Sequence, residues 1–111
     1  MLEVITKSSP TAAHPTPLLF VHGACGAVGM WDEHFLDFFA DKGHCAVALS
    51  LRGHGASQPR APLESCSLLD YVEDVTVVVG ELPSRPVLVG HSMGCCVVLK
   101  YLETWGAPAA A

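Results

Sequence analysis

The residues best suited to chemistry lie at positions 90–94 of this 111-residue sequence, which read Gly-His-Ser-Met-Gly. A serine between two glycines, placed after an apolar run and before a helical stretch, fits a sharp strand-to-helix turn. In such a turn the glycines remove side chains that would clash, and the serine hydroxyl is exposed. We therefore predict that Ser92 is a nucleophile and that Gly90, His91 and Gly94 form the turn around it.

The helix expected after this turn adds an electrostatic element to the predicted site. Its first N–H groups have no partner within the helix, and its dipole places positive charge beside Ser92. An oxyanion formed by attack on a carbonyl carbon is stabilised by donors of this kind. The chemistry that these residues indicate is acyl transfer through a covalent serine intermediate.

Hydrophobic patterns predict the elements that must position this turn. Apolar runs predict strands over 2–6, 17–21, 45–51 and 86–91, and helical periodicity predicts helices over 30–42, 67–82 and 93–105. In the first helix one face is expected to hold the aromatic residues Trp31, Phe35, Phe38 and Phe39. Gly43 is placed to cap that helix, and Ser67 begins the second helix.

Strands that alternate with helices and are apolar throughout predict an α/β fold whose parallel sheet is covered on both faces, in the order β-α-β-α-β-α. Ligands of such sheets bind at the carboxyl ends of the strands. Three glycine-rich turns follow the three buried strands, at 22–23, 52–55 and 90–94. One edge of the sheet is therefore expected to hold every unusual loop.

Three motifs, in their order along the chain, resemble the α/β-hydrolase superfamily and look closest to its esterase- and lipase-like branch. They are "VHGACG" at 21–26, "LRGHGAS" at 51–57 and "GHSMGC" at 90–95. The resemblance covers the chain from about residue 17 onward. It implies the α/β-hydrolase fold and hydrolysis of small carboxylic esters by a serine nucleophile, with no cofactor.

By this resemblance Ser92 is the nucleophile, and the backbone N–H of Met93 is one donor of the oxyanion hole. The N–H of Ala24 is the other donor in the same reading. Cys25 remains an alternative second donor, because the conformation of this loop is not readable from the sequence. Both donors are backbone groups, so the side chains at these positions are free to vary.

A few polar positions near these motifs have other expected roles. Ser50 stands where the family often has Asp, and Cys95 stands where it has a second Gly, so both could loosen the turn. Arg52 is expected to tie down its own loop rather than to bind an anionic substrate. Asp70 and Asp74 are expected to serve helix capping and local hydrogen bonding.

The base that a nucleophilic serine needs is missing from the expected place. The family supplies it as a His, oriented by Asp or Glu, later in the chain than the serine. No His or Asp follows Ser92, and the one later acid, Glu103, lies inside a predicted helix. His22, His54 and His91 precede the serine at the same edge, but they match non-catalytic letters of the family motifs.

We therefore expect a single partial α/β-hydrolase domain, residues 1–111, truncated before the later strands, the cap segment and the acid and His of the triad. The strand at 86–91 would then lack a neighbour on one side. A bare apolar edge invites association, so we expect possible self-association through this strand.

The composition of the chain indicates which classes of partner and which cellular compartment to expect. The net charge is −5 and the six Lys and Arg are scattered singly, so nucleic acid is not expected as a partner. No apolar run approaches bilayer length, and no signal-peptide pattern begins the chain, so no membrane span is expected. Five irregularly spaced cysteines indicate reduced thiols, packed as small apolar residues in a cytoplasmic protein. No Cys or His pair has the spacing of a metal site.

Three functions remain open at this point. The first is a carboxylic ester hydrolase, or part of one, that works through a Ser92 acyl-enzyme. The second is a catalytically inactive module that keeps the fold for binding or assembly. The third is an enzyme whose base comes from another chain paired with the bare edge strand.

Overall fold

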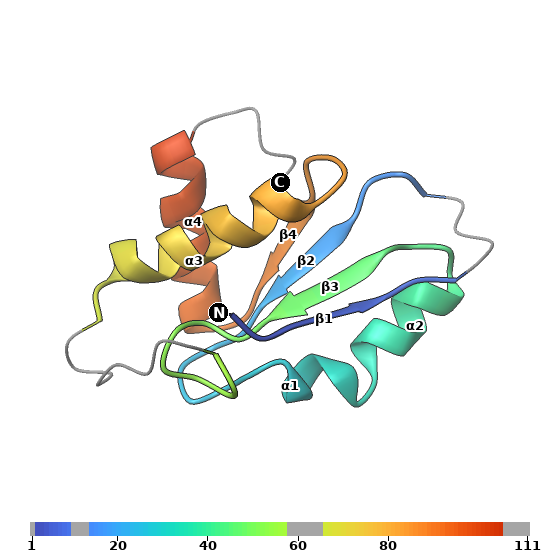
Figure 1. The fold of residues 1–111 in the computed structure, drawn as a ribbon, viewed down its shortest axis with the longest axis horizontal. Helices are drawn as coiled ribbons and strands as arrows, with labels where there is room; N and C mark the ends of the chain where they lie inside the picture. The colour runs from blue at the N-terminus through green and yellow to red at the C-terminus, as the bar shows by residue number, and fades with distance from the viewer. Residues whose placement is uncertain (1, 10–13, 58–65, 106–111) are drawn as a thin grey trace.

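A computed structural model describes residues 2–9, 14–57 and 66–105 of the chain. These residues form strands and helices in the order β1 (Val4–Lys7), β2 (Leu18–Val21), α1 (Gly29–Asp32), α2 (Phe35–Asp41), β3 (Ala46–Leu49), α3 (Leu68–Glu81), β4 (Val87–Gly90) and α4 (Met93–Trp105). Figure 1 shows the four strands as one twisted sheet with helices on its two sides. The expected alternation of strands and helices is confirmed.

The strands of the described residues lie in the order β1-β3-β2-β4. β2 is parallel to both β3 and β4, as expected, but β1 is antiparallel to β3, so the sheet is mixed. In register, Val21 pairs with Leu49 on one side and with Gly90 on the other. The three loops that leave these strands therefore start at the same edge of the sheet.

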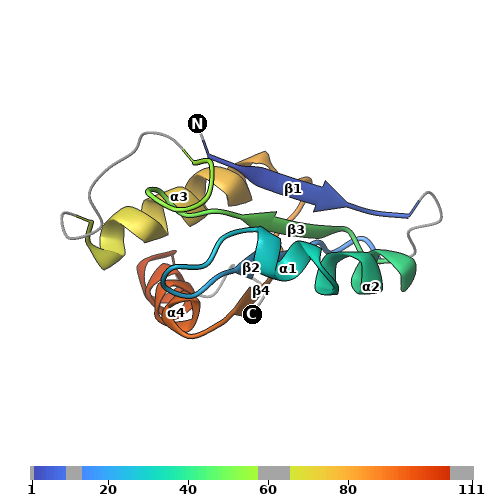
Figure 2. The same cartoon turned by 90° about the horizontal axis from the view of Figure 1, so that it is seen from below.

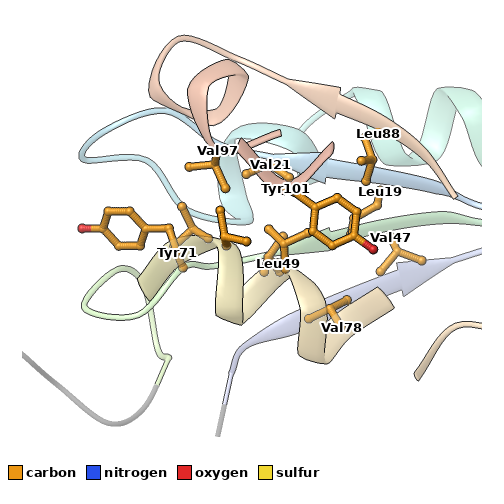
Figure 3. Close-up of a cluster of buried hydrophobic side chains, with 12 residues drawn as sticks. Leu19, Val21, Val47, Leu49, Tyr71, Val78, Leu88, Val97 and Tyr101 are labelled. Atoms are coloured by element: carbon orange, nitrogen blue, oxygen red, sulfur yellow. The ribbon is translucent and has the colours of Figure 1, made fainter. Parts of the chain in front are cut away.

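Side chains of the central strands alternate between two cores. Leu19, Val21, Val47 and Leu49 pack against α3 and α4, whereas Phe20, Ala46 and Ala48 pack against α1 and α2. Figure 3 shows the first of these cores, with Val78 of α3 and Val97 and Tyr101 of α4 beside the strands and Tyr71 of α3 at one end of the cluster. In Figure 2, α1 and α2 lie in front of the strands. Burial on both faces explains why the strands read as continuous apolar runs.

The single helix expected over 30–42 is in fact two helices, α1 and α2. The break lies at His34, whose backbone leaves the helical region with φ −149° and ψ −53°. A change of dihedral angles at one residue turns the helix that follows about its axis. The face of α2 that meets the sheet is therefore not the one that periodicity from Trp31 predicts.

The expected aromatic face is accordingly only partly correct. Trp31 is buried, but Phe35 and Phe38 are 44% and 45% exposed. Leu36 and Ala40 are the residues of α2 that are buried against the sheet.

Both expected helix caps are present. Ser67 and Asp70 form a capping box at the start of α3, in which each side chain accepts from the other's backbone N–H. After α2, Gly43 takes a left-handed φ of 92° and donates its N–H to the carbonyl of Ala40 over 3.0 Å. From the sequence we also predict that Gly106 and Pro108 close the helix of residues 93–105, but both lie outside the described residues.

The cysteines differ in part from the expectation. None of the five is paired in a disulfide, in agreement with the reduced thiols predicted from their spacing. Cys45 and Cys66 are partly buried and pack against the first core, whereas Cys25, Cys95 and Cys96 are exposed. The packing of cysteine as a small apolar residue therefore does not hold for these last three. Among the described residues, no helix has the length and apolarity needed to cross a membrane.

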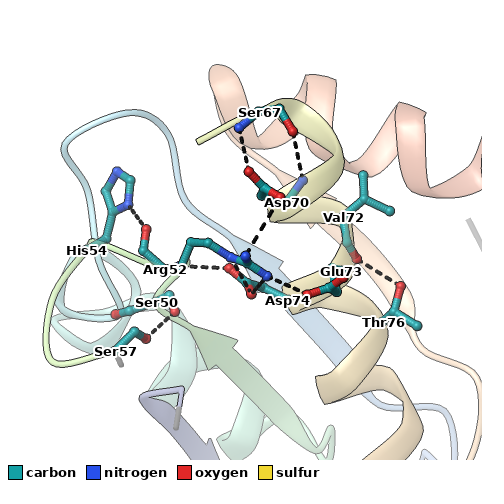
Figure 4. Close-up of polar contacts among 10 residues, drawn as sticks. All are labelled: Ser50, Arg52, His54, Ser57, Ser67, Asp70, Val72, Glu73, Asp74 and Thr76. Carbon is teal, nitrogen blue, oxygen red and sulfur yellow. Dashed lines mark hydrogen bonds and ion pairs between the residues drawn. The ribbon is translucent and has the colours of Figure 1, made fainter. Parts of the chain in front are cut away.

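The loop after β3 is held to α3 by Arg52. Its backbone N–H and its guanidinium both donate to the carboxylate of Asp74, over 2.7 to 3.0 Å, as Figure 4 shows. Asp74 is only 4% exposed, and Arg52 also contacts Asp70 and Glu73. These contacts, first of all the hydrogen bonds that the guanidinium donates to Asp74, raise the pKa of Arg52. Arg52 thus ties down its own loop, as expected.

Replacing Asp74 with Ala should lower the free energy of unfolding by about 3 kcal/mol, because a partly buried guanidinium and a backbone N–H lose their acceptor. Urea denaturation followed by circular dichroism measures this change. Glu73→Ala is the matched control, since it removes a well exposed partner of the same guanidinium and should change stability by less than about 1 kcal/mol. Equal effects of the two substitutions would contradict this account of the loop.

Candidate active site

Ser92 occupies the turn that joins β4 to α4. Its φ is +55°, in the left-handed region that residues other than glycine seldom adopt, and the residue is exposed. One residue later α4 begins, with Gly94 and Cys95 donating their N–H groups to the carbonyls of His91 and Ser92. The structure therefore presents the predicted serine on a strained strand-to-helix turn at the carboxyl edge of the sheet.

Two glycines make this turn sterically possible. At Gly94 an added Cβ would overlap the carbonyl oxygen of Val21 and lie 2.7 Å from that of His22. At Gly90 it would lie 2.7 Å from the carbonyl oxygen of Gly94 and 2.8 Å from the nitrogen of Cys95. Such distances are far below ordinary carbon contacts, so both positions require glycine.

The loop after β2 lies directly against Ser92. Gly23 is so close that an added Cβ would sit 3.0 Å from the Cβ of Ser92. Residues 23–26 form a β-turn, closed by the N–H of Gly26 on the carbonyl of Gly23 over 3.0 Å. Cys25 has φ +62° at its third position, which is the geometry of a type II turn.

Both expected oxyanion donors are at this edge. Within the part of the chain that the structure describes, the N–H groups of Ala24, Cys25 and Met93 donate to no protein acceptor. The N–H of Met93 opens α4, where the helix dipole favours negative charge. The choice between Ala24 and Cys25 as the second donor stays open.

His22 has a structural role that leaves no nitrogen for catalysis. The residue is fully buried, its Nε2 accepts the N–H of Leu51 over 2.9 Å, and its Nδ1 lies 2.7 Å from the carbonyl of Gly23. These two partners require the neutral ring with the proton on Nδ1. Burial lowers the pKa of His22 below its ordinary value, which favours the same neutral form.

The other two histidines of the edge also form no hydrogen bond with the hydroxyl of Ser92 in the described residues. The ring of His54 is buried, with Nδ1 3.0 Å from the carbonyl of Arg52. His91 is exposed, and its backbone N–H donates to Val21 over 3.1 Å. Among the described residues, no side chain hydrogen bonds to the hydroxyl of Ser92, and no group of three His, Cys, Asp or Glu side chains could hold a metal.

The two departures from the family pattern are accommodated. Ser50 is fully buried, and its hydroxyl accepts the N–H of Val28 over 3.0 Å and donates to Glu3 over 2.8 Å. Cys95 is exposed, and its thiol donates to the carbonyl of Gly90 over 3.1 Å. Neither residue intrudes on the turn, so the expected loosening of the turn has no steric basis.

Glu3 is a residue at this edge that sequence reasoning missed. It lies 47 positions before Ser50, in a segment without any motif, so no local signal identifies it.

Two hollows lie between α3 and α4, away from the predicted chemistry. They have volumes of about 350 and 200 Å³, and Thr76 and Trp105 line both of them. The indole N–H of Trp105 donates to the hydroxyl of Thr76 over 3.1 Å. Because Trp105 ends α4 and Ser92 precedes its start, neither hollow takes part in chemistry at the serine.

Comparison with known proteins places this geometry in context. A family described as "alpha/beta hydrolase fold" matches residues 16–105. Protein ABHD8 of Homo sapiens is 37% identical over 78 residues, which are 69% of this chain and 18% of that protein. A non-heme chloroperoxidase of Burkholderia pyrrocinia is 35% identical over 94 residues, which are 84% of this chain and 33% of that protein.

Solved structures agree with these matches. The thioesterase domain from the curacin biosynthetic pathway superimposes with a TM-score of 0.77 at 29% sequence identity, over 91% of this chain and 36% of that chain. The present chain thus spans about a fifth to a third of the length of the curated relatives named above.

Gly94→Ala should destabilise the protein by at least about 3 kcal/mol or prevent folding, because the added methyl overlaps backbone that cannot move independently. Thermal denaturation measures the effect. Gly80→Ala is the matched control, because a Cβ there meets nothing within 4 Å on α3. It should stabilise the protein by about 0.5 to 1 kcal/mol. A tolerated Gly94→Ala would contradict the close contact of α4 with β2.

The buried neutral state of His22 predicts an acid-sensitive fold. Its folded pKa lies below the ordinary value of 6.5, so the unfolded chain binds more protons below pH 6.5 and stability falls as the pH decreases. His22→Phe should lower the free energy of unfolding by about 1 to 3 kcal/mol at pH 7.5, because the hydrogen bond from the N–H of Leu51 is lost. The same substitution should make the free energy of unfolding fall less steeply between pH 6.5 and 5. Urea denaturation of the wild type and the variant across this pH range measures the difference. An equal decrease of the free energy of unfolding with pH in both proteins would refute the role of His22.

Proposed function

The chain belongs to the alpha/beta hydrolase fold family, and from this premise we propose that it carries the nucleophile and the oxyanion donors of a serine hydrolase acting on carboxylic esters. The observation that carries the proposal is Ser92 itself: an exposed hydroxyl on a turn with φ +55°, one residue before a helix N-terminus. Backbone strain at a non-glycine residue is frequent at functional sites. One structural neighbour is a thioesterase domain, and thioester hydrolysis is acyl chemistry of the same class.

The proposed reaction uses backbone and hydroxyl groups of this chain. The Oγ of Ser92 attacks the ester carbonyl carbon, its proton passes to a base, and the carbonyl electrons move onto the oxygen. The N–H groups of Met93 and of Ala24 or Cys25 would stabilise that oxyanion. Its collapse breaks the ester C–O bond, the leaving oxygen takes the proton from the base to give the alcohol, and an acyl-serine remains. Water then hydrolyses the acyl-serine, which releases the acid and restores the Ser92 hydroxyl.

We propose that the base lies outside the described residues. His22 and His54 use ring nitrogens for backbone carbonyl or N–H groups, and no described side chain reaches the serine hydroxyl. A serine without a base is a weak nucleophile. The coverage of only 18% and 33% of two relatives fits a chain that represents one part of a longer hydrolase.

A second function, an inactive module for binding or assembly, is favoured by the same lack of a base. In that case Ser92 would be unreactive although the turn is folded. The unpaired edge of β4 is the surface that such a module, or self-association of the chain, would use, because β4 pairs only with β2 among the described strands. We propose a cytoplasmic setting, in keeping with five cysteines that form no disulfide.

The decisive experiment is intact mass analysis of the protein from its native source, before and after a fluorophosphonate probe. We expect a species larger than 11.7 kDa that gains one adduct on Ser92, because the probe reacts with a base-activated serine. Ser92→Ala should abolish the adduct. Ser84→Ala, which changes another exposed serine, should keep it.

A native species of 11.7 kDa that is folded and gains no adduct would refute the enzyme and support the module. An adduct that appears only when a second protein copurifies would assign the base to a partner chain.

A further inference from the structure

Glu3 lies outside the family match, which begins at residue 16, yet it contacts the loops of the candidate site. It precedes β1, the strand that is antiparallel to the rest of the sheet. Its carboxylate oxygen Oε1 accepts the hydroxyl of Ser50 over 2.8 Å and the N–H of Ala56 over 3.0 Å. A single carboxylate therefore contacts the loop after β3 at its first residue, Ser50, and again at Ala56.

The backbone of Glu3 makes this placement rigid. Its N–H donates to the hydroxyl of Ser57 over 2.9 Å, and its carbonyl accepts the N–H of Ser50 over 2.9 Å. The hydroxyl of Ser57 in turn donates to the carbonyl of Ser50, as Figure 4 shows. Glu3 is thus fixed by backbone and side-chain bonds to the same loop.

The hydroxyl of Ser50 connects Glu3 to the loop after β2. A hydroxyl has one proton, and that proton points to Glu3, which leaves a lone pair for the N–H of Val28. Both groups are buried, so an unsatisfied N–H there would be costly. The carboxylate therefore orients the Ser50 hydroxyl so that its oxygen accepts the N–H of Val28.

Val28 marks the end of the loop that carries the expected oxyanion donor. The start of the loop is held by His22, which accepts from Leu51, and its end is held by Val28, which donates to Ser50. The intervening residues also pack on the loop after β3, because a Cβ at Gly55 would lie 3.1 Å from that of Ala27. Two neighbouring residues at the end of β3 therefore hold both ends of this loop.

We propose that Glu3 is a positioning residue for the oxyanion loop, and that it acts through the hydroxyl of Ser50 on the N–H of Val28. The chemical role of the loop rests on the proposed function, but the positioning itself does not. The hydrogen bonds from Ala56 and Ser50 lower the pKa of Glu3, so its side chain is the carboxylate at neutral pH.

The test is amide hydrogen exchange, read residue by residue by NMR, on the 111-residue chain. Glu3→Gln should raise the exchange rate of the Val28 amide by about fivefold, the effect of weakening one hydrogen bond. The amide of Cys95 on α4, which donates to the carbonyl of Ser92, should keep its exchange rate. Glu81→Gln removes the same charge from an exposed position of α3 and should change neither amide.

Relocating the carboxylate separates positioning from a general loss of stability. Ser50→Asp alone should raise the exchange rate of the Val28 amide more than Glu3→Gln does, because two carboxylates would face each other at hydrogen-bond distance. The double variant Glu3→Gln with Ser50→Asp places one carboxylate where it can accept directly from Val28, and it should restore slow exchange of that amide. A purely structural role of the Glu3 charge would not produce this rescue.

Unchanged exchange at Val28 in Glu3→Gln, equal acceleration of Val28 and Cys95, or failure of the double variant to restore protection would each overturn the proposal. The probe reaction at Ser92 reports separately on the proposed function. A wild-type chain that is unreactive, but shows the predicted exchange pattern, refutes the hydrolase and leaves the positioning by Glu3 in place.

Discussion

The contact between α4 and β2 at Gly94 is the constraint on which the rest of the site depends. Because no side chain separates the helix from the carbonyls of Val21 and His22, the first turn of α4 lies on the end of the sheet. The chain must then turn from β4 into α4 within two residues, and Ser92 takes the left-handed φ that such a turn needs. The exposed hydroxyl and the helix N-terminus beside it are thus consequences of one close contact between backbones.

Buried polar groups then hold the neighbouring loops in register with that turn. His22 joins the loop after β2 to Leu51, and Asp74 joins the loop after β3 to α3. Each of these groups is almost fully buried, so losing a partner would leave a polar atom without water or protein to satisfy it. Such bonds add only modest net stability, but they penalise every alternative loop arrangement, which is what a preorganised set of backbone donors requires.

The patterns of neighbouring residues in the sequence predicted most of the fold and the serine turn. They did not predict contacts between segments that are distant in the chain. The bounds of α4 and the capping box at Ser67 follow from neighbours within a few residues, so the sequence contains them. The break at His34 is a change of backbone dihedral angles at one residue, and the helical periodicity of the sequence does not reveal it. The role of Glu3 depends on a partner 47 residues away, and no motif includes that residue.

The strain at Ser92 bears on the choice between an enzyme and an inactive module. A non-glycine residue held in the left-handed region costs of order 1 to 3 kcal/mol, and glycine would adopt φ +55° without that cost. A module that needs only the fold gains nothing from a serine at this position, since its hydroxyl is exposed and bonds to no described side chain. A nucleophile, by contrast, needs both the side chain and its exposure. The residue at the turn therefore favours the proposed catalysis, in which the base would come from outside the described residues.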